Sequence, residues 1–280
     1  MFIKRLFVLV LLLTASMTWA AEEKKVEWIA HRGESYLAPE NTLASFNLAW
    51  KLGGADADET DIHLTKDNQL IISHDASTKR TTGMDLAIKD ATMAQLRALD
   101  AGSWKDPKYA GEKLPTLAEA LATIPAGKRF FVEIKVGPEA VPALVRVFKE
   151  SGKTAQQVVI ISFNADALAA AKKALPDHQC YYLASFKQDK ETKKWSPSID
   201  ELISTAKTIN ADGLDLQSKP PLNAKAIAKI KAAGLQAYAW TVDDPAEARK
   251  LIDGGIDGIT TNRAAWLREQ IEHPTTAPAK

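Results

Sequence analysis

Short apolar runs and longer segments with helical spacing alternate along the whole chain. The apolar runs predict strands, and the segments between them predict helices that begin at capping residues such as Asn41 and Asn164 and end at glycines such as Gly53. The expected strands are Glu27–His31, Asp56–Thr65 with an extension through Leu70–His74, Phe130–Lys135, Val158–Ser162, Gln179–Leu183, Gly213–Leu216, Ala237–Thr241 and Gly258–Thr260. The expected helices include Thr42–Leu52, Pro138–Ser151, Ala165–Leu175, Ala224–Ala233 and Pro245–Asp253.

This alternation predicts an α/β fold, with a parallel sheet wrapped by helices. Roughly eight strand–helix units fit the length, which favours a closed TIM (β/α)₈ barrel over an open sheet. Residues 76–115 interrupt the rhythm, because they contain turn residues and charges with only a weak helical piece, Thr92–Leu99. We expect a small insertion after the second strand there, within a single barrel domain that spans residues 21–272.

The first residues have the layout of a secretory signal peptide. Lys4 and Arg5 precede the apolar run Leu6–Leu13, and Thr18–Ala20 suits a cleavage site, so we expect residues 1–20 to be removed. The apolar run is far shorter than the roughly 20 residues that span a bilayer, so no stable membrane insertion is expected. We therefore expect the mature protein to be exported, with the periplasm as the favoured location and the extracellular medium as the alternative. Residues 273–280 are expected to form a flexible tail.

The net charge argues against a nucleic-acid partner, and the cysteine content excludes an internal disulfide. Removal of Lys4 and Arg5 takes the formal net charge from +1 to −1, and no basic face of the kind that binds nucleic acid is evident. Cys180 is the one cysteine of the chain, so an internal disulfide is impossible, and a buried apolar role is expected for it.

Three carboxylates on neighbouring predicted strands suggest a metal site. Glu59 and Asp61 are two residues apart on one strand and therefore share a face, and Glu133 lies on the next. Carboxylate oxygens on rigid strands suit one divalent cation, Ca²⁺ or Mg²⁺. The alternative is a salt-bridge network with Lys135 or Arg32.

Two histidines end predicted strands beside these carboxylates, as active-site residues do in TIM barrels. His31 and His74 could act as a general acid–base pair, and Arg32 could bind a phosphate through paired hydrogen bonds. His63 shares the face of Asp61, and a hydrogen-bonding role is favoured for it over metal ligation. The remaining histidines, His178 and His273, are expected to be solvated.

These residues belong to a longer ordered set that resembles one enzyme family. The set is similar to the signature of the glycerophosphodiester phosphodiesterase family, and its bacterial exported members in particular, over nearly the whole mature chain. It comprises His31-Arg32-Gly33, Pro39-Glu40-Asn41-Thr42, Glu59-Thr60-Asp61, Leu64-Thr65-Lys66-Asp67, His74-Asp75, Arg80-Thr81-Thr82, Asp100-Ala101-Gly102-Ser103-Trp104, Leu114-Pro115-Thr116-Leu117, Glu133-Ile134-Lys135, Ser162-Phe163, Trp240-Thr241-Val242 and Asp257-Gly258-Ile259-Thr260-Thr261-Asn262.

The resemblance implies a TIM barrel with an insertion after its second strand, and an enzyme that uses Ca²⁺ or Mg²⁺ to release glycerol 3-phosphate and an alcohol from glycerophosphodiesters. It further implies a role for each of the residues named. The implied metal ligands are Glu59, Asp61 and Glu133, the implied acid–base pair is His31 and His74, and the implied phosphate-binding residues are Arg32 and Lys135.

Phe163 and Trp240, both at predicted strand ends, could form an apolar wall for a glycerol backbone, and barrel packing is the alternative. Two rival functions remain at this point. One is a barrel phosphodiesterase that cleaves intact lipids or lysophospholipids, and the other is an exported protein that binds phosphorylated polyols without cleaving them. The pair of histidines argues against the second, because binding a phosphate requires no acid–base pair.

Overall fold

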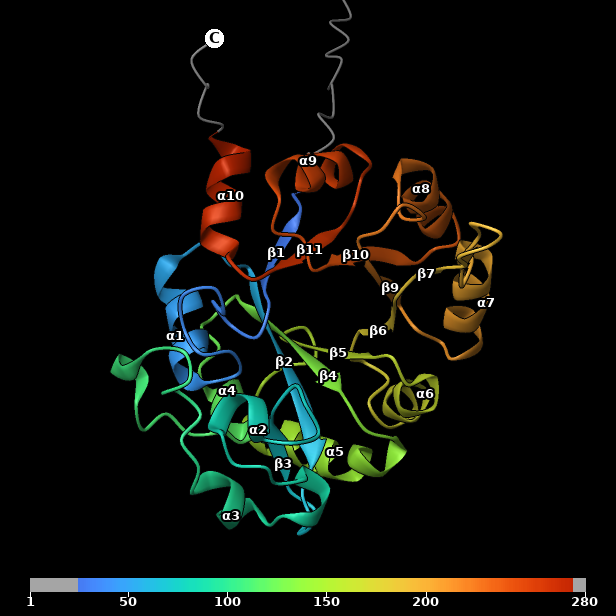
Figure 1. Cartoon of the computed structure of the whole chain (residues 1–280). Helices are drawn as coiled ribbons and strands as arrows, with labels where there is room; N and C mark the ends of the chain where they lie inside the picture. Colours follow the sequence, from blue (N-terminus) through green and yellow to red (C-terminus); the bar gives the residue numbers. More distant parts are fainter. Residues whose placement is uncertain (1–24, 274–280) are drawn as a thin grey trace, which may run out of the picture.

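The computed structural model describes residues 25–273, and within them eight parallel strands close into a barrel. Going round the barrel, the order is β1, β11, β10, β9, β6, β5, β4 and β2, and β2 pairs with β1 to complete the ring (Figure 1). The strands are β1 (Glu27–Ala30), β2 (Ala57–Leu64), β4 (Arg129–Ile134), β5 (Val158–Ser162), β6 (Cys180–Ala184), β9 (Gly213–Gln217), β10 (Gln236–Trp240) and β11 (Gly258–Thr261). The predicted TIM barrel is confirmed.

Helices surround this barrel, and each of them follows a strand in the chain (Figure 1). Three of them, α4, α7 and α10, were not among the helices expected from the sequence pattern. The outer helices are α1 (Leu43–Leu52), α4 (Leu117–Ala122), α5 (Val141–Ser151), α6 (Ala165–Ala174), α7 (Ile199–Thr208), α8 (Ala224–Ala232), α9 (Pro245–Asp253) and α10 (Ala264–Glu272). A small hairpin of β7 (Lys187–Gln188) and β8 (Trp195–Ser196) precedes α7.

Local capping explains where the helices begin and end. At the start of α1, Thr42 and Ser45 each accept a hydrogen bond from the other's main-chain N–H, which satisfies two donors that the helix leaves free. Gly53 ends α1 in the left-handed conformation, with φ of 74°. Asn164 caps α6 as expected, accepting a hydrogen bond from the main-chain N–H of Ala167.

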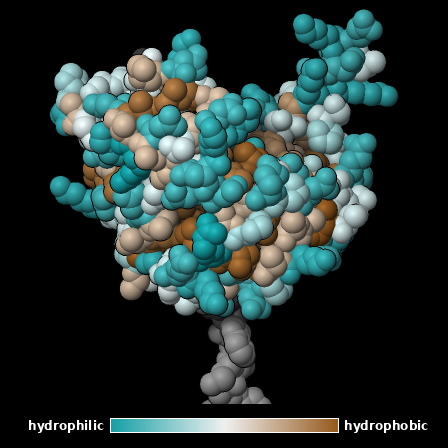
Figure 2. All heavy atoms as spheres, turned by 90° about the horizontal axis from the view of Figure 1, so that it is seen from below, coloured by the Kyte–Doolittle hydropathy of each residue, from teal (hydrophilic) through white to brown (hydrophobic). Residues whose placement is uncertain are grey.

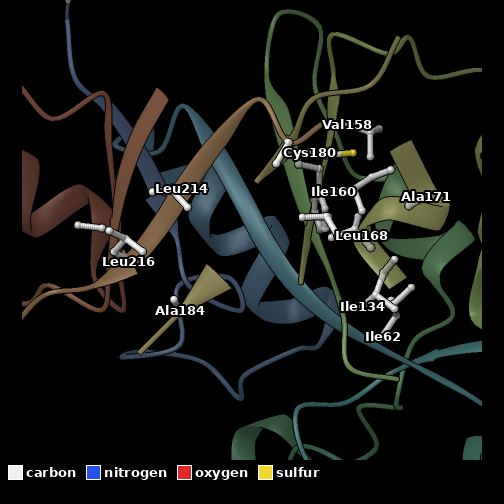
Figure 3. Packing of buried hydrophobic residues seen from close by; sticks show 14 of the residues in the cluster. Ile62, Ile134, Val158, Ile160, Leu168, Ala171, Cys180, Ala184, Leu214 and Leu216 are labelled. Carbon is white, nitrogen blue, oxygen red and sulfur yellow. The ribbon is translucent and has the colours of Figure 1, made fainter. Parts of the chain in front are cut away.

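Two layers of apolar side chains hold the barrel together. The larger layer lies between strands and helices, where Ile160 of β5 and Cys180 of β6 pack with Leu168 and Ala171 of α6 (Figure 3). The buried, unpaired Cys180 confirms its expected role. The smaller layer fills the interior of the barrel, and polar residues lie at the carboxyl ends of the strands. Its members are Ile29, Ala57, Phe131, Val159, Ile161, Tyr181, Leu183 and Tyr238.

The expected extension of the second strand through Leu70–His74 is wrong. A separate short strand, β3 (Leu70–Ile72), turns back and pairs antiparallel with β2. The reversal occurs at Asn68, which has a φ of 55°, where the side chain of Thr65 donates to Asp67 at 2.6 Å. Because β3 returns along β2, the segment that carries His74 comes back to the level of the interior carboxylates.

Residues between β3 and α4 form a compact segment with a small core of its own. It contains α2 (Lys79–Thr82) and α3 (Met93–Arg97), and the latter falls within the expected helical piece Thr92–Leu99. Its side chains also reach the loop that follows β1, since Lys105 Nζ donates to the carbonyl of Ser35 at 2.9 Å. The core residues are Ile71, Ile88, Ala91, Met93, Leu96, Ala101 and Leu114.

The outer surface is mixed in character. On the face seen from below in Figure 2, hydrophilic residues predominate and hydrophobic ones form separate areas between them. None of the helices within residues 25–273 has the length and apolar content needed to cross a membrane. His273 is exposed, as expected, whereas the predicted signal peptide (residues 1–20) and residues 274–280 of the tail lie outside the described part of the chain.

Candidate active site

The three carboxylates predicted as metal ligands meet inside the barrel. Glu59 and Asp61 point inward from β2, and Glu133 points inward from β4 as the register partner of Asp61. One oxygen from each of the three lies within 4.8 Å of the others, and all three side chains are buried. His63 lies apart from this group and contacts the carbonyl of His74 through Nε2 at 3.3 Å, in line with its expected hydrogen-bonding role.

Two cationic side chains contact this cluster, so the predicted salt-bridge network is also present. Lys135 Nζ lies 2.8 Å from Glu133 Oε1 and 3.3 Å from Asp61 Oδ1, and Arg32 Nε lies 3.3 Å from Asp61 Oδ2. Burial opposes ionisation of Asp61, but Arg32 and Lys135 outweigh it and hold the pKa of this carboxyl at about 2. Asp61 is therefore ionised throughout the physiological range.

The nearby cations do not offset the cost of ionising the other two carboxyls, Glu59 and Glu133. Burial and the negative charge of Asp61 raise the pKa of Glu133 to about 8, and the same two causes raise the pKa of Glu59 well above its usual range. Three ionised carboxylates would exceed the charge of Arg32 and Lys135 by one unit. An oxygen-lined cluster with this deficit of positive charge fits a hard divalent cation such as Ca²⁺ or Mg²⁺.

His31 is held in one orientation by a chain of hydrogen bonds from the next strand round the barrel. Its Nδ1 lies 2.7 Å from Oδ1 of Asn262, and Nδ2 of Asn262 donates to Asp243 at 2.6 Å. Since the amide presents its oxygen to the ring, Nδ1 carries the proton and Nε2 keeps its lone pair. Burial, together with the charge of Arg32, lowers the pKa of His31 to about 4, so the ring is neutral near pH 7.

His74 has a carboxylate partner instead of an amide. Its Nδ1 lies 2.8 Å from Oδ1 of Asp75, and Arg80 of α2 donates from Nε to the other oxygen of Asp75 at 2.6 Å. The two histidines therefore differ in their partners: an amide oxygen faces His31, and a negative charge faces His74.

Glu40 links the two sides of the site. It accepts from Nη1 of Arg32 at 2.8 Å and from both terminal nitrogens of Arg80 at 2.8 Å. A continuous series of ion pairs therefore runs from Asp61 through Arg32, Glu40 and Arg80 to Asp75. In this arrangement Arg32 is fixed with its guanidinium beside the carboxylate cluster.

Asn41, predicted to cap the first helix, has a different position. Thr42 caps α1, and Asn41 adopts a φ of 58° that turns its side chain toward β2. Its Nδ2 donates to Asp61 Oδ2 at 2.8 Å, and its Oδ1 accepts from Thr60 at the same distance. The pattern of capping residues could not distinguish Asn41 from its neighbour, because both are common helix caps.

The site opens into a cavity in the mouth of the barrel. Phe163 and Trp240 form part of its wall, with ring centroids 5.4 Å apart and planes at 84°. Trp240 is held by a hydrogen bond from Nε1 to the carbonyl of Asp215 at 3.1 Å. The cavity is lined by His31, Arg32, Glu59, His74, Glu133, Lys135, Ile161, Phe163, Leu183, Asp215, Trp240, Thr241 and Thr260. The predicted site residues thus meet around one cavity, with Asp61 buried directly behind it.

Sequence reasoning gave no role to three further polar residues here, Asp215, Asp243 and Asn262. Asn262 follows β11 directly and Asp243 follows β10, so the placement of active-site residues after barrel strands could have indicated both. His178, expected to be solvated, is half-buried and stacks on Phe148 with ring centroids 5.2 Å apart. That prediction was wrong because the loop after α6 packs against α5.

Comparison with known proteins identifies the family of this chain. The model of the "Glycerophosphoryl diester phosphodiesterase family" matches residues 31–265, which include every predicted site residue. The chain belongs to this family. It is 32% identical to the glycerophosphodiester phosphodiesterase of Bacillus subtilis, over 84% of this chain and 82% of that protein. A protein of the same name from Caldanaerobacter subterraneus is 34% identical, over 84% of this chain and 93% of that one.

Solved structures agree with this assignment. A phosphodiesterase from Oleispira antarctica, solved in complex with the product sn-glycerol-3-phosphate, is 31% identical, with a TM-score of 0.78. The match covers 88% of this chain and 96% of that one. A glycerophosphodiester phosphodiesterase from Thermotoga maritima is 27% identical, with a TM-score of 0.67, and the match covers 86% of this chain and 96% of that one.

Proposed function

We propose that this protein hydrolyses glycerophosphodiesters to glycerol 3-phosphate and an alcohol, using one divalent cation and two histidines. The observation that carries the proposal is the meeting of His31 and His74 with the cluster of Glu59, Asp61 and Glu133 around one cavity. Family membership and the named activity of relatives that match over most of their length support it. The product bound to the Oleispira antarctica relative supports glycerol 3-phosphate as the product.

The carboxylates Glu59, Asp61 and Glu133 would hold Ca²⁺ or Mg²⁺. Such an ion, when bound, supplies Lewis-acid stabilisation of charge on a phosphate oxygen. Arg32 and Lys135 would share the remaining negative charge of the phosphate, and both already lie within ion-pair distance of the cluster. Phe163 and Trp240 would flank the organic part of the substrate in the cavity.

The partners of the two histidines support an order for the proton transfers. His31 has a free Nε2 lone pair and would accept the proton of the nucleophile, either water or the neighbouring glycerol hydroxyl. As the new P–O bond forms, the P–O bond to the leaving alcohol breaks. His74, whose ring Asp75 orients through Nδ1, would give a proton to the departing oxygen. With water as the nucleophile, the protein returns to its starting state by exchanging one proton at each histidine with solvent. With the glycerol hydroxyl as the nucleophile, this step would give a cyclic phosphate, and water would then open it to glycerol 3-phosphate with His74 as the base and His31 as the acid.

Two other functions compete with this one. A barrel phosphodiesterase could act on intact lipids or lysophospholipids, and an exported protein could bind phosphorylated polyols without cleaving them. The second is disfavoured by the acid–base geometry, because a phosphate-binding protein has no use for a histidine with a free lone pair facing its ligand.

Substrate choice separates these possibilities. Purified protein supplied with both cations would receive glycerophosphocholine and lysophosphatidylcholine in separate reactions, followed by ³¹P NMR. Release of glycerol 3-phosphate from glycerophosphocholine supports the proposal, whereas cleavage of the lysolipid alone supports the lipid-cleaving rival. Tight binding of glycerophosphocholine with neither substrate cleaved would instead support the binding protein.

We further propose that the protein is exported, to the periplasm or the medium, after cleavage behind Ala20. The support is the arrangement of Lys4, Arg5 and the apolar run Leu6–Leu13. The mass of the protein isolated from the native host's envelope and medium tests this. A mature chain that begins at Ala21 is expected, and a full-length chain in the cytoplasm would contradict the proposal.

A further inference from the structure

Asp215 is a buried carboxyl in the same cavity, and neither the metal cluster nor the histidine pair uses it. It lies on β9 with 1% of its surface exposed, and it lines the cavity beside Leu183 and Trp240. Its Oδ1 is buried without a hydrogen-bond partner among the described residues. Burial alone raises the pKa of this carboxyl to about 8, with no charged group or hydrogen bond to offset it.

The position of β9 separates Asp215 from the phosphate site. Going round the barrel from β2 in either direction, β9 is the fourth strand, so it lies opposite the strand that carries Glu59 and Asp61. A phosphodiester with its phosphate at the carboxylate cluster has two organic arms. An arm that enters the cavity, rather than solvent, would meet the wall that Asp215 lines.

The carboxyl group of Asp215 forms no hydrogen bond or ion pair within the described residues that would stabilise the fold. Its register partners on the adjacent strands are Leu183 and Tyr238, and the hydroxyl of Tyr238 donates to Glu27 instead. The hydrogen bond that fixes Trp240 uses the main-chain carbonyl of Asp215. An unpaired buried carboxyl costs free energy of folding, whereas an apolar side chain of similar size would pack there without that cost. Such a group is retained where a ligand supplies its partner.

We propose that Asp215 binds the hydroxyl groups of the glycerol arm and thereby selects polyol phosphodiesters over diesters with apolar arms. The proposal rests on the proposed function. Hydroxyls fit better than an ammonium group, because near pH 7 the carboxyl of Asp215 retains its proton and can both donate to one hydroxyl and accept from another. The glycerol arm is also the part that all glycerophosphodiesters share, so a fixed, enclosed acceptor suits it better than the variable head group.

Binding measurements test this without depending on turnover. The affinity of cation-loaded protein for sn-glycerol 3-phosphate and for n-propyl phosphate, which lacks both hydroxyls, would be measured by calorimetry. We expect the wild type to prefer glycerol 3-phosphate by about 10- to 100-fold, because n-propyl phosphate lacks both of the hydroxyls that would hydrogen-bond with the neutral carboxyl. Asp215→Leu should lose most of this preference, and Asp215→Asn should retain part of it.

Asp200→Asn is the matched control, since it removes an exposed carboxylate on α7 and should leave the preference unchanged. An unchanged preference in Asp215→Leu, or no preference in the wild type, would overturn the proposal. Weaker binding of phosphocholine alone by Asp215→Leu would also overturn it, by assigning the carboxylate to an ammonium group. A wild type that selects glycerol 3-phosphate but cleaves no diester would contradict the proposed function and leave the role of Asp215 standing.

Discussion

Asn262 presents its side-chain oxygen to Nδ1 of His31 at 2.7 Å, across 231 positions of sequence. The two residues directly follow β1 and β11, where Ala30 and Thr261 are register partners. Their contact therefore depends on closure of the barrel between its first and last strands. Because the hydrogen bond fixes which ring nitrogen carries the proton, it makes a direct link between barrel closure and the proposed base.

Replacement of Asn262 should weaken catalysis without removing any group that touches the substrate. In Asn262→Leu the His31 ring loses the acceptor that fixes its tautomer, and we expect kcat to fall by about 10- to 100-fold, as for other residues that orient a catalytic group. Ser35→Ala is the control, because Ser35 donates to the same oxygen at 3.0 Å without contacting the ring. Equal losses in the two variants would contradict the orienting role.

The leaving group should distinguish the acid from the base. His31→Ala and His74→Ala should each lower kcat with glycerophosphocholine by about 10²- to 10⁴-fold. With the p-nitrophenyl ester of glycerol 3-phosphate, whose leaving group needs no proton, His74→Ala should recover most of its rate and His31→Ala should not. Recovery by His31→Ala instead would reverse the two roles.

The acid side of the pH profile should report His31. Its pKa is lowered to about 4, and a base acts only when unprotonated, so kcat/KM should hold as the pH falls through 6 and decline only near 4. Asn262→Leu should move this decline to lower pH, since the hydrogen bond from Asn262 raises the pKa of His31. A decline centred near 6.5, the ordinary value for histidine, would contradict the assignment.

Asp215→Leu should stabilise the fold, and more so at higher pH. The carboxyl binds its proton more tightly when folded, with a pKa of about 8, than when unfolded, with an ordinary value of 3.8. Its contribution to folding stability therefore falls as the pH rises from about 4 to about 8. Thermal unfolding should show a larger gain in Tm for the leucine variant at pH 8 than at pH 5. A lower Tm at both values would assign Asp215 a structural role.

The cluster of three carboxylates could be predicted from the sequence. The two-residue spacing of Glu59 and Asp61 guarantees a common face, and strand order brings Glu133 beside them. The position of His74 required the turn at Asn68, because an uninterrupted strand and a hairpin give the same apolar pattern. The position of Asn262 after a barrel strand could have marked it as a site residue, but its pairing with His31 could not be predicted, because that pairing depends on which strands become neighbours when the barrel closes. The role of Asp215 depends in the same way on which strands lie opposite one another.

Cation dependence of turnover tests the central proposal most directly. Release of glycerol 3-phosphate from glycerophosphocholine would be followed in wild-type protein after EDTA and after addition of Ca²⁺ or Mg²⁺, with Glu133→Gln alongside. We expect EDTA to abolish release, one of the cations to restore it, and the variant to need a higher cation concentration because a ligand charge is lost. Release that persists in EDTA, or no release with either cation, would contradict the proposed enzyme.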